Sequence, residues 1–134
     1  MSCPRPAGGP AEHDDLRLGL MRAGIRLRDA VADPTEFGEA RAELVAFCVE
    51  RVLPHLQHDE RWLARAEDCA PGGLLAEAMR TESRAITAAV FEVESAEEPC
   101  EAVGATRVLH TLLALHADQE EHLASAISLD GRPA

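Results

Sequence analysis

The chain has 134 residues, a length typical of one domain that can bury a core without disulfides or structural metals. Its 24 Asp and Glu outnumber its 13 Lys and Arg, and the formal net charge of -11 predicts that nucleic acid and anionic lipid are not partners. Tyr is absent and there is one Trp, whereas Ala, Leu, Glu and Arg are abundant, which indicates an all-α fold.

The sequence lacks features that direct a chain to a membrane or to an oxidising compartment. It has no run of about 18 apolar residues, which a membrane span needs, and residues 1–6 lack the apolar segment of a signal peptide. The four cysteines show no Cys-x-x-Cys spacing, so we expect reduced thiols without a metal or redox role. We therefore expect a cytoplasmic protein.

The first half of the chain contains an N-terminal arm and two predicted helices. Residues 1–11 form the irregular arm, because three prolines and two glycines interrupt it. Apolar residues recur at intervals of three and four over residues 12–32, which predicts the first helix. A second helix is expected over residues 34–69, since Asp33 is a suitable N-cap, a proline follows it, and Glu36 lies three residues after the cap.

Prolines and glycines mark a bend in the second helix and the limits of two further helices. The second helix should bend at Pro54, which cannot donate the helical hydrogen bond. A Pro-Gly-Gly break at residues 71–73 precedes a third helix over residues 74–95, and a fourth begins near Pro99. Four helices with short connections predict an antiparallel, up-down-up-down four-helix bundle over residues 12–130.

Two helices carry a histidine followed four residues later by a carboxylate. The pairs are His55 with Asp59 and His116 with Glu120. Positions four apart lie on the same face of a helix, so each pair directs an imidazole and a carboxylate to one point. These groups are donors to iron, manganese and zinc, so the two pairs predict a metal site.

The helical rise places a third histidine at the depth of these pairs. Measured from the end shared by the first two helices, His13 and His55 lie roughly 28 and 31 Å along their axes. His116 lies roughly 26 Å from the start of the fourth helix, which is at the same end of the predicted bundle. The candidate metal ligands are therefore His13, His55, Asp59, His116 and Glu120.

With these motifs the chain resembles the hemerythrin-like, or HHE cation-binding, family. The resemblance covers about residues 12–128 and rests on Glu12-His13, on His-Leu-Gln-His-Asp-Glu at residues 55–60 and on His-Ala-Asp-Gln-Glu-Glu at residues 116–121. It implies an antiparallel four-helix bundle around a non-haem di-iron centre that binds oxygen or related small molecules.

The resemblance also implies a role for each ligand. His13 and His55 would serve one iron and His116 the other, and Asp59 and Glu120 would bridge the two.

The chain departs from the family pattern in the third helix. The family usually has Met-x-x-Glu-His there, whereas residues 79–83 read Met-Arg-Thr-Glu-Ser, so Ser83 replaces the histidine. One metal position keeps two histidines and two carboxylates, and the other lacks a donor that Glu82 could replace. The departure predicts a weaker second metal, a mononuclear site or an open position for a substrate. The shorter Asp59, where the family has Glu, also argues against oxygen carriage.

Three functions follow from these expectations. The first is a non-haem iron protein, with two irons or one, that binds or reacts with oxygen, peroxide or nitric oxide. The second is a redox enzyme whose organic substrate uses the position that Ser83 leaves vacant, through a pocket lined by Ala85, Ala88 and Ala89. The third is a metal-free helical interaction module in which the same side chains hydrogen-bond to each other.

Overall fold

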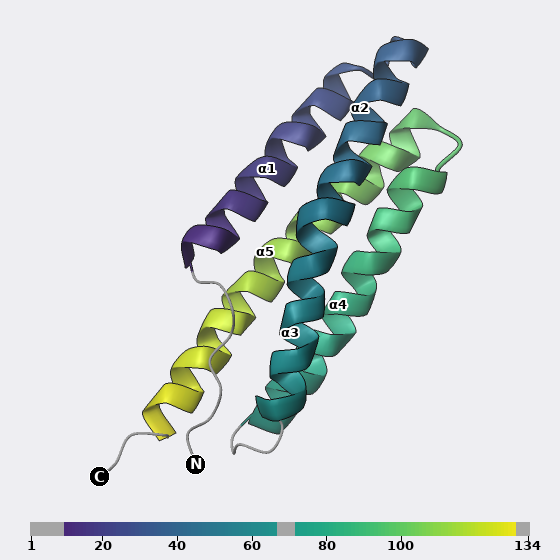
Figure 1. Cartoon of the computed structure of the whole chain (residues 1–134). Helices are drawn as coiled ribbons and strands as arrows, with labels where there is room; N and C mark the ends of the chain where they lie inside the picture. Colours follow the sequence, from purple (N-terminus) through teal and green to yellow (C-terminus); the bar gives the residue numbers. More distant parts are fainter. Residues whose placement is uncertain (1–9, 67–71, 131–134) are drawn as a thin grey trace.

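The computed structural model describes residues 10–66 and 72–130, which form helices with short connections and contain no strand (Figure 1). The helices are α1 (Pro10–Asp29), α2 (Pro34–Phe47), the π-helix η1 (Cys48–Val52), α3 (Leu53–Ala66), α4 (Gly72–Ser95) and α5 (Pro99–Asp130). Because α2, η1 and α3 follow one another without a break, the described residues make four helical rods. The all-α fold predicted from composition is confirmed.

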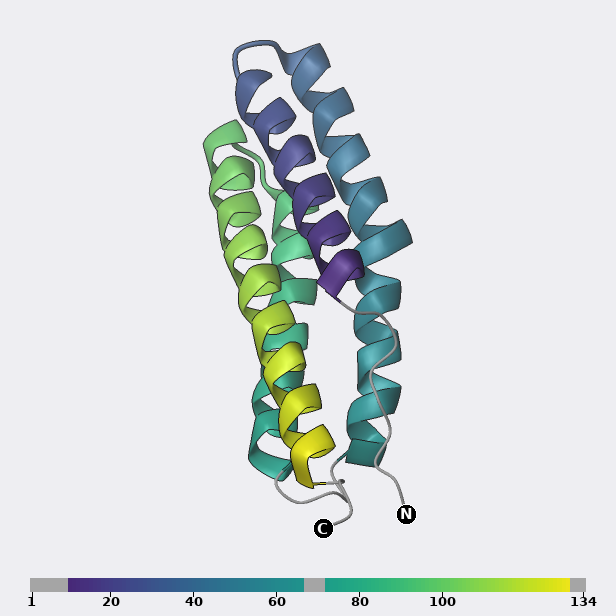
Figure 2. The same cartoon turned by 90° about the vertical axis from the view of Figure 1, so that its left-hand side faces the viewer.

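Each rod packs against two others. α1 contacts α5 and the rod formed by α2, η1 and α3, and α4 contacts α5 and that same rod. Figures 1 and 2 show that the connection from α1 to α2 lies at the same end of the molecule as the connection from α4 to α5. Within the described residues, no helix combines the length and the apolar character that crossing a membrane requires.

The start of α2 follows the capping signal in the sequence. Asp33 lies just before the helix in an extended conformation, and its carboxylate accepts the backbone N–H groups of Thr35 and Glu36 at 2.9 and 3.2 Å. These bonds satisfy two N–H groups that have no partner inside the helix. The N-cap predicted at Asp33 is confirmed.

A π-helical turn precedes Pro54. The backbone N–H of Leu53 donates to the carbonyl of Cys48, five residues earlier, which defines η1 as a widened turn. A proline ring crowds the carbonyl four residues before it, here that of Glu50, and a widened turn relieves such crowding. The sequence predicted an irregularity just before His55, and the structure has it one to two turns earlier.

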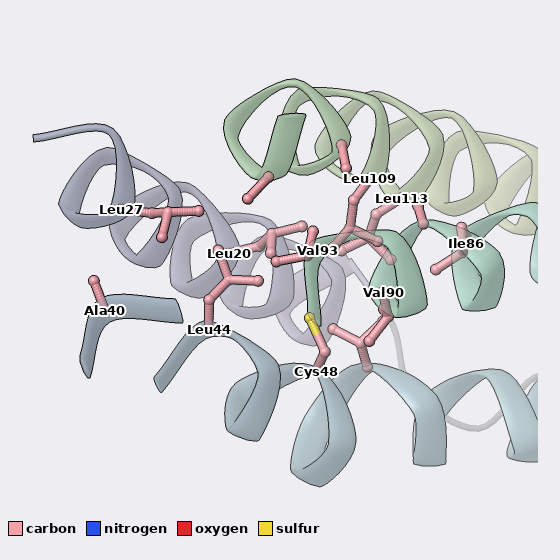
Figure 3. Close-up of a cluster of buried hydrophobic side chains, with 14 of the residues drawn as sticks. Leu20, Leu27, Ala40, Leu44, Cys48, Ile86, Val90, Val93, Leu109 and Leu113 are labelled. Atoms are coloured by element: carbon pink, nitrogen blue, oxygen red, sulfur yellow. The ribbon is translucent and has the colours of Figure 1, made fainter. Parts of the chain in front are cut away.

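Two clusters of apolar side chains form the core. The larger one draws residues from all four rods, and Figure 3 shows Leu20, Leu44, Cys48, Val93 and Leu109 directed into the space between the helices. Cys48 is fully buried, and this burial raises the pKa of its thiol to about 12. The smaller cluster consists of Trp62, Leu63, Ala76, Met79 and Leu123.

Candidate metal centre

A group of buried polar side chains separates the two apolar clusters. Along the rod formed by α2, η1 and α3 the group lies between Val52 and Trp62, and along α5 it lies between Leu113 and Leu123. Its members, none more than 8% exposed, are His13, His55, Asp59, Ser83, His116 and Glu120. Burying charged groups costs several kcal/mol each unless they are paired or bind metal, so this polar layer has to be held together by its own contacts or by a cation.

His13 and His55 meet at one oxygen of Glu120. The Nε2 atoms of the two rings lie 3.1 and 3.2 Å from Glu120 Oε2, and the rings stand edge to face with their centres 5.3 Å apart. Each of the three residues offers one ligand atom, and these atoms lie within 4.8 Å of one another. Two imidazoles and a carboxylate from three different rods therefore surround one point.

His116 forms a second such group with Asp59 and Glu120. The Nε2 atom of His116 donates to Asp59 Oδ2 at 3.0 Å, and the same oxygen lies 3.2 Å from His55 Nε2. The ligand atoms of His116, Asp59 and Glu120 also lie within 4.8 Å of one another. Glu120 belongs to both groups, and Asp59 contacts a histidine of each, so the two points adjoin and share carboxylates.

The outer nitrogens of the first two histidines also have carboxylate partners. His13 Nδ1 donates to Glu121 Oε1 and His55 Nδ1 donates to Glu12 Oε1, both at 3.1 Å. A carboxylate at Nδ1 fixes the orientation of the ring and keeps the proton on that nitrogen. With Nδ1 bonded to a carboxylate at the edge, each ring directs its Nε2 atom into the polar layer.

Glu82 lies near Nδ1 of His116, as the other two glutamates lie at Nδ1 of His13 and His55. Its Oε2 atom lies 3.5 Å from His116 Nδ1 without forming a hydrogen bond, and burial raises the pKa of its carboxyl. Among the described residues that could hold a metal, Glu82 belongs to neither group. The structure therefore places Glu82 at the outer nitrogen of His116 rather than among the ligand atoms, and its role as a ligand stays a prediction.

The charges within the layer balance one another. Burial would lower the pKa of His55, but its hydrogen bonds to Asp59 and Glu120 raise the pKa to about 10. The hydrogen bond to Glu120 likewise raises the pKa of His13. Burial would raise the pKa of Asp59, yet hydrogen bonds from His116 and His55 hold it well below its usual value. The protonated imidazoles of His13 and His55 thus supply positive charge beside the carboxylates of Asp59 and Glu120, as a metal cation would.

The donor set of the layer fits a metal ion. Within the described residues, Asp59 Oδ1 and Glu120 Oε1 are buried and have no hydrogen-bond partner. Buried carboxylate oxygens of this kind are costly, because a buried polar atom normally has at least one partner. Coordination by a cation would satisfy them, and imidazole with carboxylate is a donor set that divalent transition metals accept.

Ser83 lies at the edge of the layer and lines an open pocket of about 390 Å³ between α3 and α4. Its hydroxyl is buried and has no hydrogen-bond partner within the described residues. The pocket is lined by Leu53, Leu56, Gln57, Glu60, Ser83, Arg84 and Thr87. Ala85, Ala88 and Ala89, the residues expected from the sequence to line a substrate pocket, are not in the wall of this one, which faces α3; a pocket along these alanines stays a prediction.

The structure brings together five of the six residues predicted from the sequence as metal ligands. It also adds the contact of Glu12 with His55, for which the spacing gave no signal, because 43 residues separate the pair. The remaining histidines lie elsewhere: His58 and His122 are exposed and His110 is half-buried beside α1.

Comparisons with protein-family models, with curated proteins and with solved structures found no match. The case for a metal centre therefore rests on the geometry of this chain.

Proposed function

We propose that the chain is a non-haem iron protein that holds one or two ions in its polar layer and binds or reacts with oxygen, peroxide or nitric oxide. The observation that carries the proposal is the common orientation of three histidines. Nε2 of His13, His55 and His116 faces Asp59 and Glu120, and each Nδ1 has a carboxylate of its own nearby. Metal-binding histidines usually have this arrangement, with a carboxylate behind the ring.

The choice of iron rests on the resemblance to the hemerythrin-like family, and the kinds of donor are compatible with it. The candidate ligands are imidazoles and carboxylates, whereas structural zinc sites usually include cysteine, and Cys48 lies in the apolar cluster instead. Carboxylates shared by adjacent points would suit two neighbouring ions. When bound, iron would supply redox chemistry and an affinity for small oxygen- and nitrogen-containing molecules.

We also propose that the four rods form an antiparallel, up-down-up-down bundle of the hemerythrin-like type. Both the α1–α2 and the α4–α5 connections lie at one end of the molecule, which supports this path (Figures 1 and 2). The motifs that carry the resemblance support it as well, since Glu12, His13, the pair His55–Asp59 and the stretch at residues 116–121 all contribute side chains to the layer or to its edge.

Each part of the layer has a task in this proposal. Asp59 and Glu120 place negative charge between the two points where metal would bind. Glu12 and Glu121 hold the rings of His55 and His13 in position. The apolar clusters on both sides exclude water and so strengthen every electrostatic interaction in the layer.

Metal content after loading with ferrous iron tests the proposal. We expect one to two irons per chain by elemental analysis, and an absorption spectrum characteristic of non-haem iron. His116→Ala removes one imidazole donor and should lower the iron content. His122→Ala is the matched control, because His122 is exposed and, among the described residues, bonds to the backbone carbonyl of Asp118 alone; it should leave the iron content unchanged.

The metal-free interaction module is the outcome that would contradict the proposal. In that case purified protein would carry no stoichiometric metal after loading, and the two alanine variants would behave alike.

The pocket at Ser83 favours a second candidate, a redox enzyme with an organic substrate. Its volume of about 390 Å³ lies in the range of small-molecule sites, and the hydroxyl of Ser83, which has no partner within the described residues, offers a hydrogen bond at its wall. The substrate would approach the second metal position between α3 and α4.

The route can be tested without an activity assay. Ser83→Leu should fill part of the pocket and slow the removal of iron by a chelator, whereas Ser83→Ala should not. Equal rates in the two variants would remove the pocket as the route.

A further inference from the structure

A second open pocket, of about 400 Å³, lies between α1 and α5 and shares no residue with the polar layer. Leu20, Gly24 and Val103 contribute to its lining, together with Met21 and Ile25 on α1. Met21 and Ile25 are 44% and 42% exposed, which is high for side chains of this size. The pocket is therefore an apolar groove that no other part of the described chain covers.

The absence of a side chain at Gly24 keeps the groove open. A Cβ atom added there would lie 3.2 Å from Thr106 Cγ2, so the methyl group of Thr106 faces this position. The hydroxyl of Thr106 donates to the carbonyl of Ala102 at 2.8 Å within its own helix. Both residues thus present apolar surface to the groove.

The charged groups at the groove are cationic. Arg28 and Arg107 line it together with His110, and none of its lining residues is Asp or Glu. Residues 17–28 carry four arginines, residues 102–117 carry one, and neither stretch contains an acid, although the whole chain has a net charge of -11. Three of the four α1 arginines already pair with carboxylates just outside these stretches, those of Asp14, Glu43 and Asp29, so an anion at the groove would be attracted chiefly by Arg107.

The two arginines differ in how far they are already paired. Arg28 lies 3.4 Å from the carboxylate of its neighbour Asp29, and both side chains are exposed. Arg107 has no ion pair within the described residues. A ligand carboxylate at Arg107 would therefore gain a charge-assisted hydrogen bond without displacing an existing partner.

Exposed apolar side chains continue beyond the pocket on both helices. On α1, Leu18 lies three residues before Met21, and on α5, Leu115 lies four residues after Thr111, which lines the pocket. The two leucines are 40% and 46% exposed. An ion pair of Arg17 with Asp118, at 3.9 Å, links the two helices beyond them. From residue 17 to residue 28 the helix is about 16 Å long, enough for an extended aliphatic chain.

We infer that this groove binds a small amphipathic carboxylate. Its apolar chain lies along Met21 and Ile25, and its carboxylate pairs with Arg107, with Arg28 nearby. The volume lies within the range of about 300–1,000 Å³ that small-molecule sites occupy. The inference does not depend on the metal proposal, because the groove and the polar layer use different residues.

Calorimetric titration with octanoate tests the inference, with octan-1-ol as a neutral probe of similar length. Octanoate should bind more tightly than octan-1-ol. Arg107→Gln should weaken octanoate roughly tenfold, through loss of a charge-assisted hydrogen bond, and leave octan-1-ol unchanged. Arg22→Gln is the matched control: it removes the same charge from α1 at a position outside the groove, and octanoate should bind as before.

Replacing an exposed wall residue provides a second variant. Ile25→Gln should weaken both probes, because it removes apolar surface and leaves the arginines in place. The inference is wrong if neither probe binds, if the two bind equally, or if Arg107→Gln and Arg22→Gln act alike. It is also wrong if sedimentation shows that the chain is a dimer and Ile25→Gln dissociates it, since the groove is then an interface between copies.

Discussion

Both ring nitrogens of His13 and of His55 have carboxylate partners, and these partners play different parts. Nε2 faces Glu120 inside the polar layer, whereas Nδ1 donates to Glu121 or to Glu12 at its edge. The edge carboxylates are 38% and 43% exposed, so their ion pairs contribute little to folding. Their effect on the rings is larger, because a carboxylate at Nδ1 makes Nε2 a stronger ligand and fixes its direction.

Replacing an edge carboxylate should therefore weaken metal binding more than it weakens the fold. Glu121→Gln keeps the size of the side chain but removes its charge from His13, and Glu12→Gln does the same to His55. We expect each to lower metal affinity by roughly 10- to 100-fold, measured by competition with a chelator, with little change in the unfolding midpoint of the metal-free protein.

Glu60→Gln is the control for this pair. Glu60 is also an exposed glutamate in the motif of the second rod, but it pairs with Arg80 at 3.4 Å. Metal affinity should be unchanged in this variant. A loss as large as that of Glu121→Gln would mean that general surface charge, not the contact with a ring, sets the affinity.

The helical rods could be predicted from the sequence because their signals are local. The capping bonds of Asp33 involve the next three residues, and the apolar spacing of each helix repeats within two turns. The π-helical turn could not be predicted in this way. A proline predicts a disturbance in its helix, but here the π-helical turn at Cys48–Val52 lies before the proline, at residues that belong to the larger apolar cluster.

Two glycines in the rods should respond in opposite ways to alanine. A Cβ at Gly19 in α1 would lie 2.5 Å from the Cζ atom of Phe47, so Gly19→Ala forces the ring to move and should destabilise the fold by about 1–3 kcal/mol. A Cβ at Gly38 in α2 meets no atom within 4 Å, so Gly38→Ala should stabilise by about 0.5–1 kcal/mol through helix propensity. Urea unfolding of the metal-free variants measures both.

Gly104 provides a check on this comparison. It lies in α5, and an added Cβ would also meet no atom within 4 Å, so Gly104→Ala, like Gly38→Ala, should stabilise the fold. The packing argument fails if Gly19→Ala is as stable as these two variants.

The depth of the three site histidines could be predicted because the helical rise is a constant, whereas their contacts depend on how each rod is rotated. Rise alone brought His13, His55 and His116 to one level. The contact of Glu12 with His55 depends on the rotation of two rods and on side-chain reach, which no spacing encodes. For the same reason the sequence did not predict that the opening beside Ser83 faces α3.

The polar layer links the stability of the whole molecule to its occupancy. Three imidazoles and two carboxylates lie between two apolar clusters, and two carboxylate oxygens there have no hydrogen-bond partner within the described residues. A cation that satisfies these oxygens binds the folded chain and not the unfolded one, because the five residues are far apart in sequence. Metal should therefore stabilise the fold by mass action.

This linkage gives a measurable shift in melting temperature. At a free ferrous iron concentration 100 times the dissociation constant, the stabilisation is about 2.7 kcal/mol, which corresponds to a rise of roughly 10 °C for a chain of this size. Asp59→Asn, which removes the charge in contact with His55 and His116, should reduce the rise, and magnesium should give little of it because magnesium prefers all-oxygen sites. If iron and magnesium shift the melting temperature of the native chain and of Asp59→Asn equally, the ions act on the acidic surface and the polar layer binds no metal.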